Sequence, residues 1–163
     1  MRLLALFIVL AALLDQISKY VVIHAMNLAQ IRAIDVLPPL LNFRYGENRG
    51  INFGLFGDGT SAWVLIALAL VICAAVLWWL RGGGQPRIVY ACAGLLIGGA
   101  LGNVIDRVLY GYVLDFLNIS CCGIQNPFVF NVADIFIFAG AIGLVLFAKD
   151  QKPPSTKQGK KQA

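Results

Sequence analysis

Histidine occurs once in the sequence, at His24, and the pattern His-Glu-x-x-His is absent. The four cysteines form no Cys-x-x-Cys pair. The adjacent Cys121 and Cys122 are poor disulfide partners, because bonded cysteines usually have their Cα atoms roughly 4.4–6.8 Å apart. These absences disfavour a zinc peptidase, and we expect neither a metal site nor a disulfide framework.

Charged residues are also scarce. They make up 13% of the chain, against 60% hydrophobic residues, and eight of them are acidic. Soluble domains are roughly 45–50% apolar, so this composition indicates a polytopic membrane protein instead. The net charge of +5 is concentrated from Lys149 onward and at Arg81 and Arg87. We interpret it as a signal of membrane topology and expect no nucleic-acid partner.

Four apolar stretches have about the 20 residues that a helix needs to cross a bilayer. They are Leu3–Ala25, Ser61–Leu80, Ile88–Leu109 and Phe128–Ala148. No small-x-small cleavage site follows the first stretch, so we interpret it as a retained helix and not as a signal peptide. The sequence therefore predicts an all-α membrane protein with four transmembrane helices.

The basic residues predict the orientation of these helices. Arg2, the Arg81–Arg87 loop and the lysine-rich end fall on one side of a four-helix topology, so the positive-inside rule places both termini in the cytoplasm. Residues 1–149 are expected to form a single four-helix membrane domain. Residues 150–163 are expected to form a basic, disordered cytoplasmic tail.

The segment Leu37–Gly57 does not have a helical pattern, because Pro38 and Pro39 interrupt any helix. Apolar and polar residues partly alternate in Leu41–Tyr45 and again in Ile51–Phe56. This pattern predicts a small extracytoplasmic β-hairpin or sheet between the first and second helices.

Polar residues inside the apolar stretches lie at a common depth. Measured at about 1.5 Å per residue from the cytoplasmic end, Asp15 and Lys19 lie about 18 and 24 Å along the first helix. On the same scale, Asn103 and Asp106 lie about 22 and 27 Å along the third helix. Scattered structural residues would have no reason to gather in the outer half of the bilayer, whereas a functional site would.

Two aspartates are the strongest catalytic candidates. Asp115 lies in Gly111-Tyr-Val-Leu-Asp115-Phe, and Asp134 in Phe130-Asn131-Val-Ala-Asp134, near the outer ends of apolar stretches. A carboxylate at membrane depth is costly to bury, so it is a functional candidate by default. Two carboxylates that meet can share a proton and activate water.

The other polar residues have structural interpretations as well. Asp15 and Lys19 are four residues apart with the acid first, which favours an intrahelical ion pair, although direct contact with a substrate is also open. Arg107, on the face of Asn103, can extend to the headgroups or orient a carboxylate or a lipid phosphate. Asp106 lies on a different face and could hold the loops.

Gly94, Gly98 and Gly102 repeat at every fourth position. Such a stripe of small residues predicts close packing against a neighbouring helix, with no chemistry of its own.

Five motifs together resemble the lipoprotein signal peptidases, also called signal peptidase II, over nearly the whole chain. In order they are Asp15-Gln-x-Ser-Lys19, Asn48-x-Gly50-x-x-Phe53, Gly98-Gly-Ala-Leu-Gly-Asn103-x-x-Asp106-Arg107, Val113-Leu-Asp115-Phe116 and Phe130-Asn131-x-Ala133-Asp134. One such motif would be weak evidence, whereas five in this order on four helices are highly specific.

The resemblance implies a multi-pass aspartyl endopeptidase of the bacterial inner membrane, with its active site near the outer leaflet. Its substrate would be a prolipoprotein carrying a diacylglyceryl group, cut just before the lipidated cysteine. Asp115 and Asp134 would be the catalytic pair. The residues that would line or brace the site are Asn48, Gly50, Asn103, Arg107 and Asn131. Those that would support it are Asp15, Lys19 and Asp106. We expect a monomer in contact with membrane phospholipids and without a cofactor.

Other functional classes stay open on the residues alone. A small ion or proton transporter could use Asp15, Lys19, Asp115 and Asp134 as a relay, although no internal repeat is present. In a non-enzymatic membrane assembly factor the aspartates would be structural. The other family of intramembrane aspartyl proteases is disfavoured, because its Gly-x-Gly-Asp signature is absent.

Overall fold

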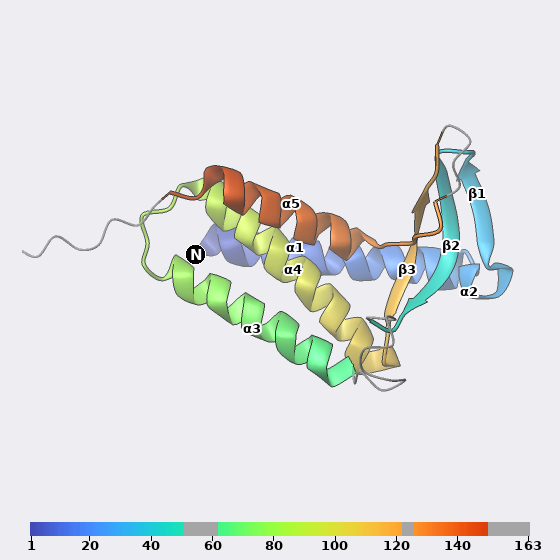
Figure 1. Cartoon of the computed structure of the whole chain (residues 1–163), viewed down its shortest axis with the longest axis horizontal. Helices are drawn as coiled ribbons and strands as arrows, with labels where there is room; N and C mark the ends of the chain where they lie inside the picture. Colours follow the sequence, from blue (N-terminus) through green and yellow to red (C-terminus); the bar gives the residue numbers. More distant parts are fainter. Residues whose placement is uncertain (51–61, 122–125, 150–163) are drawn as a thin grey trace, which may run out of the picture.

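A computed structural model describes residues 1–50, 62–121 and 126–149. Within these ranges, long helices run side by side and a small sheet closes one end of the molecule (Figure 1). The helices are α1 (Arg2–Lys19), α3 (Ala62–Leu80), α4 (Arg87–Tyr110) and α5 (Val132–Phe147). A π-helical turn, Tyr20–Ala25, extends α1 and is followed by the short α2 (Leu28–Ile31). The predicted cytoplasmic tail lies outside the described residues.

Three helices in the described part of the chain are long and apolar enough to cross a membrane: Arg2–Ala25, Ala62–Leu80 and Arg87–Tyr110. The prediction of a mostly helical membrane protein is confirmed to that extent. The fourth predicted helix, α5, is apolar but has only 16 residues. It begins later than predicted because Phe130 is extended and forms backbone hydrogen bonds with Leu117.

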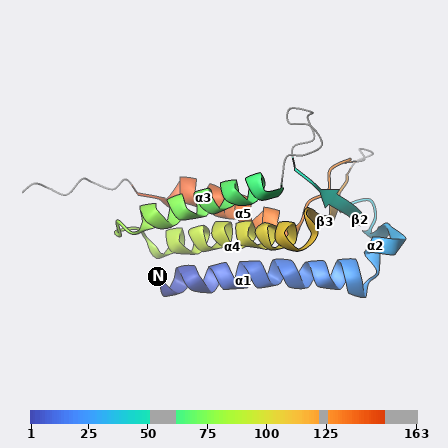
Figure 2. The same ribbon diagram turned by 90° about the horizontal axis from the view of Figure 1, so that it is seen from below.

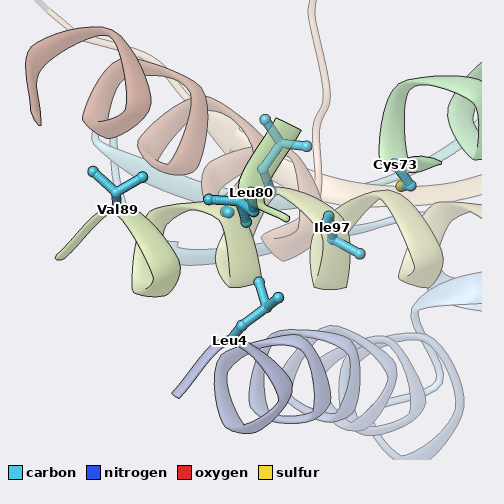
Figure 3. Packing of buried hydrophobic residues seen from close by; sticks show 7 residues of the cluster. Leu4, Cys73, Leu80, Val89 and Ile97 are labelled. Atoms are coloured by element: carbon cyan, nitrogen blue, oxygen red, sulfur yellow. The ribbon is translucent and has the colours of Figure 1, made fainter. Parts of the chain in front are cut away.

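Helix α4 lies at the centre of the bundle and contacts α1, α3 and α5 (Figures 1 and 2). Near the end opposite the sheet, an apolar cluster joins α1, α3 and α4 (Figure 3). Its buried members include Leu4, Cys73, Leu80, Val89 and Ile97. Large apolar side chains cover the outside of the bundle, as expected where lipid replaces water as the solvent.

The glycine stripe of α4 brings α1 very close. A Cβ atom added to Gly98 would lie 2.7 Å from the Cβ of Ala11, and one added to Gly102 would lie 2.6 Å from Oδ2 of Asp15. Neither distance leaves room for a side chain. The prediction of close helix packing along this stripe is therefore confirmed.

The sheet has three antiparallel strands in the order β1 (Ala33–Leu37), β2 (Leu41–Asn48) and β3 (Val113–Ile119). The predicted sheet after the first helix is present, but the pairing differs from the prediction. The described hairpin joins β1 to β2, whereas Ile51–Phe56, predicted as its second strand, lie outside the described residues.

The third strand comes from a segment for which the sequence predicted no strand. Residues Val113–Phe116 are all buried, so β3 lacks the alternation of apolar and polar residues that reveals a half-exposed strand. It is buried because it lies between β2 and the extended backbone at Phe130, to which it is hydrogen-bonded. Asp115 therefore stands on a strand enclosed on both edges.

The cysteines are only partly as expected. Cys73 and Cys92 are buried and free, in agreement with their place in apolar helices. Cys121, just after β3, is disulfide-bonded, so the expectation was wrong for this residue. That expectation rested only on the usual Cα separation of bonded cysteines, which is a preference of disulfide geometry and does not forbid a bond.

Candidate active site

Asn131 begins α5 and fixes Asp134 at the same time. Its side-chain Oδ1 accepts a hydrogen bond from the backbone N–H of Asp134 at 3.0 Å, and its own backbone N–H donates to Oδ2 of Asp134 at 3.2 Å. This reciprocal pair is a capping box, which satisfies backbone donors that the first turn of a helix leaves unpaired. The carboxylate of Asp134 is thereby held in one orientation.

Strand β3 presents Asp115 to the same residue. Nδ2 of Asn131 donates to Oδ1 of Asp115 at 2.6 Å, and Nδ2 of Asn48 donates to Oδ2 at 3.1 Å. Asn48 is the last residue of β2, so the central strand reaches Asp115 from the opposite side. Asp115 is only 3% exposed. Both aspartates are thus bonded to Asn131, one from a strand and one from a helix.

Asn103 of α4 completes the set of amides. Its Nδ2 donates to Oδ1 of Asp134 at 3.0 Å. Its Oδ1 accepts from Nδ2 of Asn131 at 3.1 Å and from Nζ of Lys19 at 3.3 Å. Because two donors converge on Oδ1, the amide group of Asn103 is oriented with its own donor toward the carboxylate.

Burial and the neighbouring charge of Asp134 raise the pKa of Asp115 from its ordinary value to about 7. The hydrogen bonds from Asn48 and Asn131 oppose this change, since they favour the ionised form. A carboxyl group with a pKa in this range is suited to proton transfer near neutral pH.

Behind the two aspartates lies a buried ionic cluster. Nζ of Lys19 is 2.8 Å from Oδ2 of Asp15 and 2.7 Å from Oδ2 of Asp106. All three side chains are at most 3% exposed. Asp15 also accepts a hydrogen bond from the backbone N–H of Ala133, and Asp106 accepts one from that of Leu114. Asp15 thus attaches α1 to the first turn of α5, which carries Asp134. Asp106 attaches α4 to β3, which carries Asp115.

Gln16 belongs to this cluster, although the sequence analysis did not select it as a site residue. Its Nε2 donates to Oδ1 of Asp106 at 2.9 Å and to the carbonyl oxygen of Gly102 at 3.2 Å. The available signal was its position inside an apolar helix, where a polar side chain needs an internal partner.

Gly50 and Arg107 lie at the edge of the site. The N–H of Gly50 donates to Oδ1 of Asn48, and its φ of 93° is in the left-handed region that favours glycine. A side chain at this position would also overlap Leu65. Arg107 donates through Nη1 to the backbone oxygen of Asn103 at 3.3 Å, and its buried Nε has no partner among the described residues.

An apolar groove of about 570 Å³ runs along α5 from Asp134. Its lining residues recur along one side of the helix: Phe130, Asp134, Ile135, Phe138, Ala139 and Ile142. Asp134 is half-buried, whereas Asp115 is almost completely enclosed. The pair therefore has one member beside an open apolar surface and one inside the protein.

The structure brings the ten predicted site residues together at the end of the bundle that carries the sheet. Eight of them form one connected set of hydrogen bonds and ion pairs: Asp15, Lys19, Asn103, Asp106, Asn131, Asp115, Asp134 and Asn48. Arg107 and Gly50 are attached to this set. Among the residues described, no group of three His, Cys, Asp or Glu side chains could hold a metal ion. The arrangement is a pair of carboxylates supported by amides.

Comparison with known proteins identifies related sequences. The family described as Signal peptidase (SPase) II matches residues 7–149. The lipoprotein signal peptidase of Alteromonas mediterranea is 41% identical over 140 residues, covering 84% of this chain and 75% of the relative. That of Methylorubrum extorquens is 39% identical over 158 residues, covering 94% and 90%.

Solved structures of bacterial membrane enzymes share the fold of this chain. A bacterial membrane enzyme determined by the in meso method is 29% identical, with a TM-score of 0.72 over 86% of this chain and 84% of that one. A second such structure, also 29% identical, has a TM-score of 0.73 and covers 86% and 88%. The chain is thus a membrane-embedded peptidase by class. It belongs to the signal peptidase II family, whose members are membrane proteases that process prolipoproteins.

Proposed function

We propose that this protein is an aspartyl endopeptidase that removes the signal peptide from diacylglyceryl-modified prolipoproteins, cutting before the lipidated cysteine. The observation that carries the proposal is the shared bonding of Asp115 and Asp134 to Asn131. Two neighbouring carboxylates do not readily ionise together, so we expect this pair to share one proton.

The two aspartates have different environments, and this difference supports a proposal for their roles. Burial favours the neutral form of a carboxyl group, so Asp115 retains the shared proton. Asp134 borders the groove, where a water molecule and a substrate have access to it. Asp134 is therefore the base that accepts a proton from the attacking water, and Asp115 is the acid that donates a hydrogen bond to the scissile carbonyl.

The reaction then follows from these roles. Water adds to the carbonyl carbon as its proton passes to Asp134, and the proton of Asp115 stabilises the developing oxyanion. Collapse of the tetrahedral intermediate breaks the C–N bond, and the leaving nitrogen takes up a proton from the pair. Asn48, Asn103 and Asn131 hold the carboxylates so that little reorganisation is needed during this sequence.

The groove along α5 suits the apolar part of such a substrate. A signal peptide has an apolar helical region, and a diacylglyceryl group adds further apolar surface to bury. In this proposal α5 is the fourth spanning helix, both termini are cytoplasmic, and the site opens near the outer leaflet. The scissile bond then reaches Asp134 while the signal helix and acyl chains stay in lipid.

Cleavage of a purified diacylglyceryl-modified prolipoprotein tests the proposal directly. The wild-type protein should release a signal peptide that ends just before the lipidated cysteine. Asp115→Asn and Asp134→Asn should each lose at least about 10³-fold in rate while remaining folded. Asp35→Asn is the matched control, since Asp35 is exposed and pairs only with Arg44 among the described residues. Equal cleavage by all four proteins would overturn the assigned dyad.

A further inference from the structure

A second cavity, unconnected with the aspartates, lies at the other end of the bundle. It has a volume of about 640 Å³ and lies between the first turns of α1 and α4. Its lining residues are Met1, Arg2, Leu3, Leu6, Arg87 and Tyr90. At 1.5 Å per residue, Arg2 is about 20 Å along α1 from Asp15, and Arg87 about 24 Å along α4 from Asn103. The cavity is therefore separate from the candidate active site.

The lining combines two kinds of side chain. Arg2 and Arg87 bring guanidinium groups from two different helices, whereas Leu3 and Leu6 supply an apolar wall. Leu4 and Val89, on the same helix ends, belong to the buried cluster that joins α1, α3 and α4 (Figure 3). The cavity thus combines cationic and apolar lining residues next to a buried core.

Neither arginine has a carboxylate partner within the described parts of the chain. The acidic residues described there are Asp15, Asp35, Glu47, Asp106, Asp115 and Asp134, all located at the sheet end or in the outer part of the helices. Two guanidinium groups beside an apolar wall, at the end of membrane-spanning helices, match the chemistry of a phosphodiester headgroup with its acyl chains.

We propose that this cavity binds the headgroup of an anionic phospholipid at the cytoplasmic face of the membrane. Arg2 and Arg87 contact the phosphate, where the planar fork of a guanidinium offers paired donors, and an acyl chain lies against Leu3 and Leu6. The lipid joins α1 to α4 at the end farthest from the ionic cluster of Lys19. The positive-inside rule alone does not require a cavity, and Arg81 satisfies that rule although it is not among the residues that line this cavity.

The test compares lipids on the purified full-length protein. Native mass spectrometry should show that the wild type retains phosphatidylglycerol about tenfold better than phosphatidylcholine. The double variant Arg2→Gln/Arg87→Gln should lose that preference, and Arg81→Gln is the matched control that should keep it. Arg2→Lys/Arg87→Lys retains both charges and should recover part of the preference, which separates loss of binding from loss of folding.

Three outcomes would overturn the proposal. The first is equal retention of the two lipids by the wild type, and the second is an unchanged preference in the double glutamine variant. The third is displacement of the bound lipid by millimolar inorganic phosphate, which would indicate a simple anion site. Cleavage activity is not used as a readout, so the result is independent of the proposed catalytic function.

Discussion

Nδ2 of Asn131 lies 2.6 Å from Oδ1 of Asp115, while Oδ1 of the same side chain caps the helix that carries Asp134. One asparagine thus connects a strand, a helix and both candidate catalytic groups. Since this residue has a structural and a positioning role, suitable substitutions can separate the two.

Asn131→Ser and Asn131→Ala are expected to differ in stability but not in activity. Serine can still cap α5, whereas alanine cannot, so the alanine variant should be less stable by about 1 kcal/mol. Neither side chain replaces the donor to Asp115, so both variants should lose about 10²-fold in rate. Thermal unfolding in detergent and cleavage rates measure the two effects. A serine variant with wild-type activity would contradict the positioning role.

The pH dependence of cleavage should be bell-shaped, with its basic limb near pH 7. Burial and the charge of Asp134 raise the pKa of Asp115 to about 7, so Asp115 keeps the required proton below that pH and loses it above. A bell shape is the profile expected when one acid and one base are both required. A rate that stays flat from about pH 4 to about pH 9 would contradict the shared proton.

Asn48→Ala should move the basic limb of this profile to higher pH. The hydrogen bond from Nδ2 of Asn48 lowers the pKa of Asp115, so its removal lets that pKa rise further. The maximal rate should also fall, because Oδ2 of Asp115 loses its donor. Asn126→Ala is a suitable control, since the hydrogen bonds described for Asn126 join it to residues 118–120 and to Phe128, and none of them reaches Asp115. A profile that shifts to lower pH would argue against the assignment of Asp115 as the acid.

Lys19→Met should strongly destabilise the fold. It leaves Asp15 and Asp106 buried without their shared cation, and breaking a buried ion pair in this way costs about 3–5 kcal/mol. Adding Asp15→Asn to Lys19→Met should recover part of the loss. Thermal unfolding in detergent provides the measurement, with the exposed Lys149→Met as control. Equal melting temperatures for Lys19→Met and Lys149→Met would show that the cluster contributes little.

Gly102→Ala is expected to force α1 and α4 apart. Its Cβ would lie 2.6 Å from Oδ2 of Asp15, and overpacking of this kind costs about 1–3 kcal/mol. Leu109→Ala, at an exposed position on the same helix, should cost far less. A Gly102→Ala protein as stable as the wild type would mean that Asp15 can move without loss.

The long helices were predictable from the sequence, because each apolar run has about the length that a helix needs to cross a bilayer. The polar residues were recognisable because they interrupt or border these runs. The spacing of Gly98 and Gly102 likewise predicted close contact with a neighbouring helix, and the structure shows that this helix is α1. Strand β3 was not predictable, since Val113–Phe116 are buried without alternation and their partners come from distant segments. The role of Gln16 and the dual bonding of Asn131 depend on side-chain geometry that spacing along one helix does not encode.

The cap of α5 also bears on how such a protein is made. Asn131 holds both aspartates only when α5 has begun at its proper residue beside β3. If the proposed dyad is correct, a chain whose last helix has not yet been inserted has no assembled catalytic pair. The enzyme would then be inactive during its own biogenesis. It would not cleave neighbouring nascent chains until its insertion was complete.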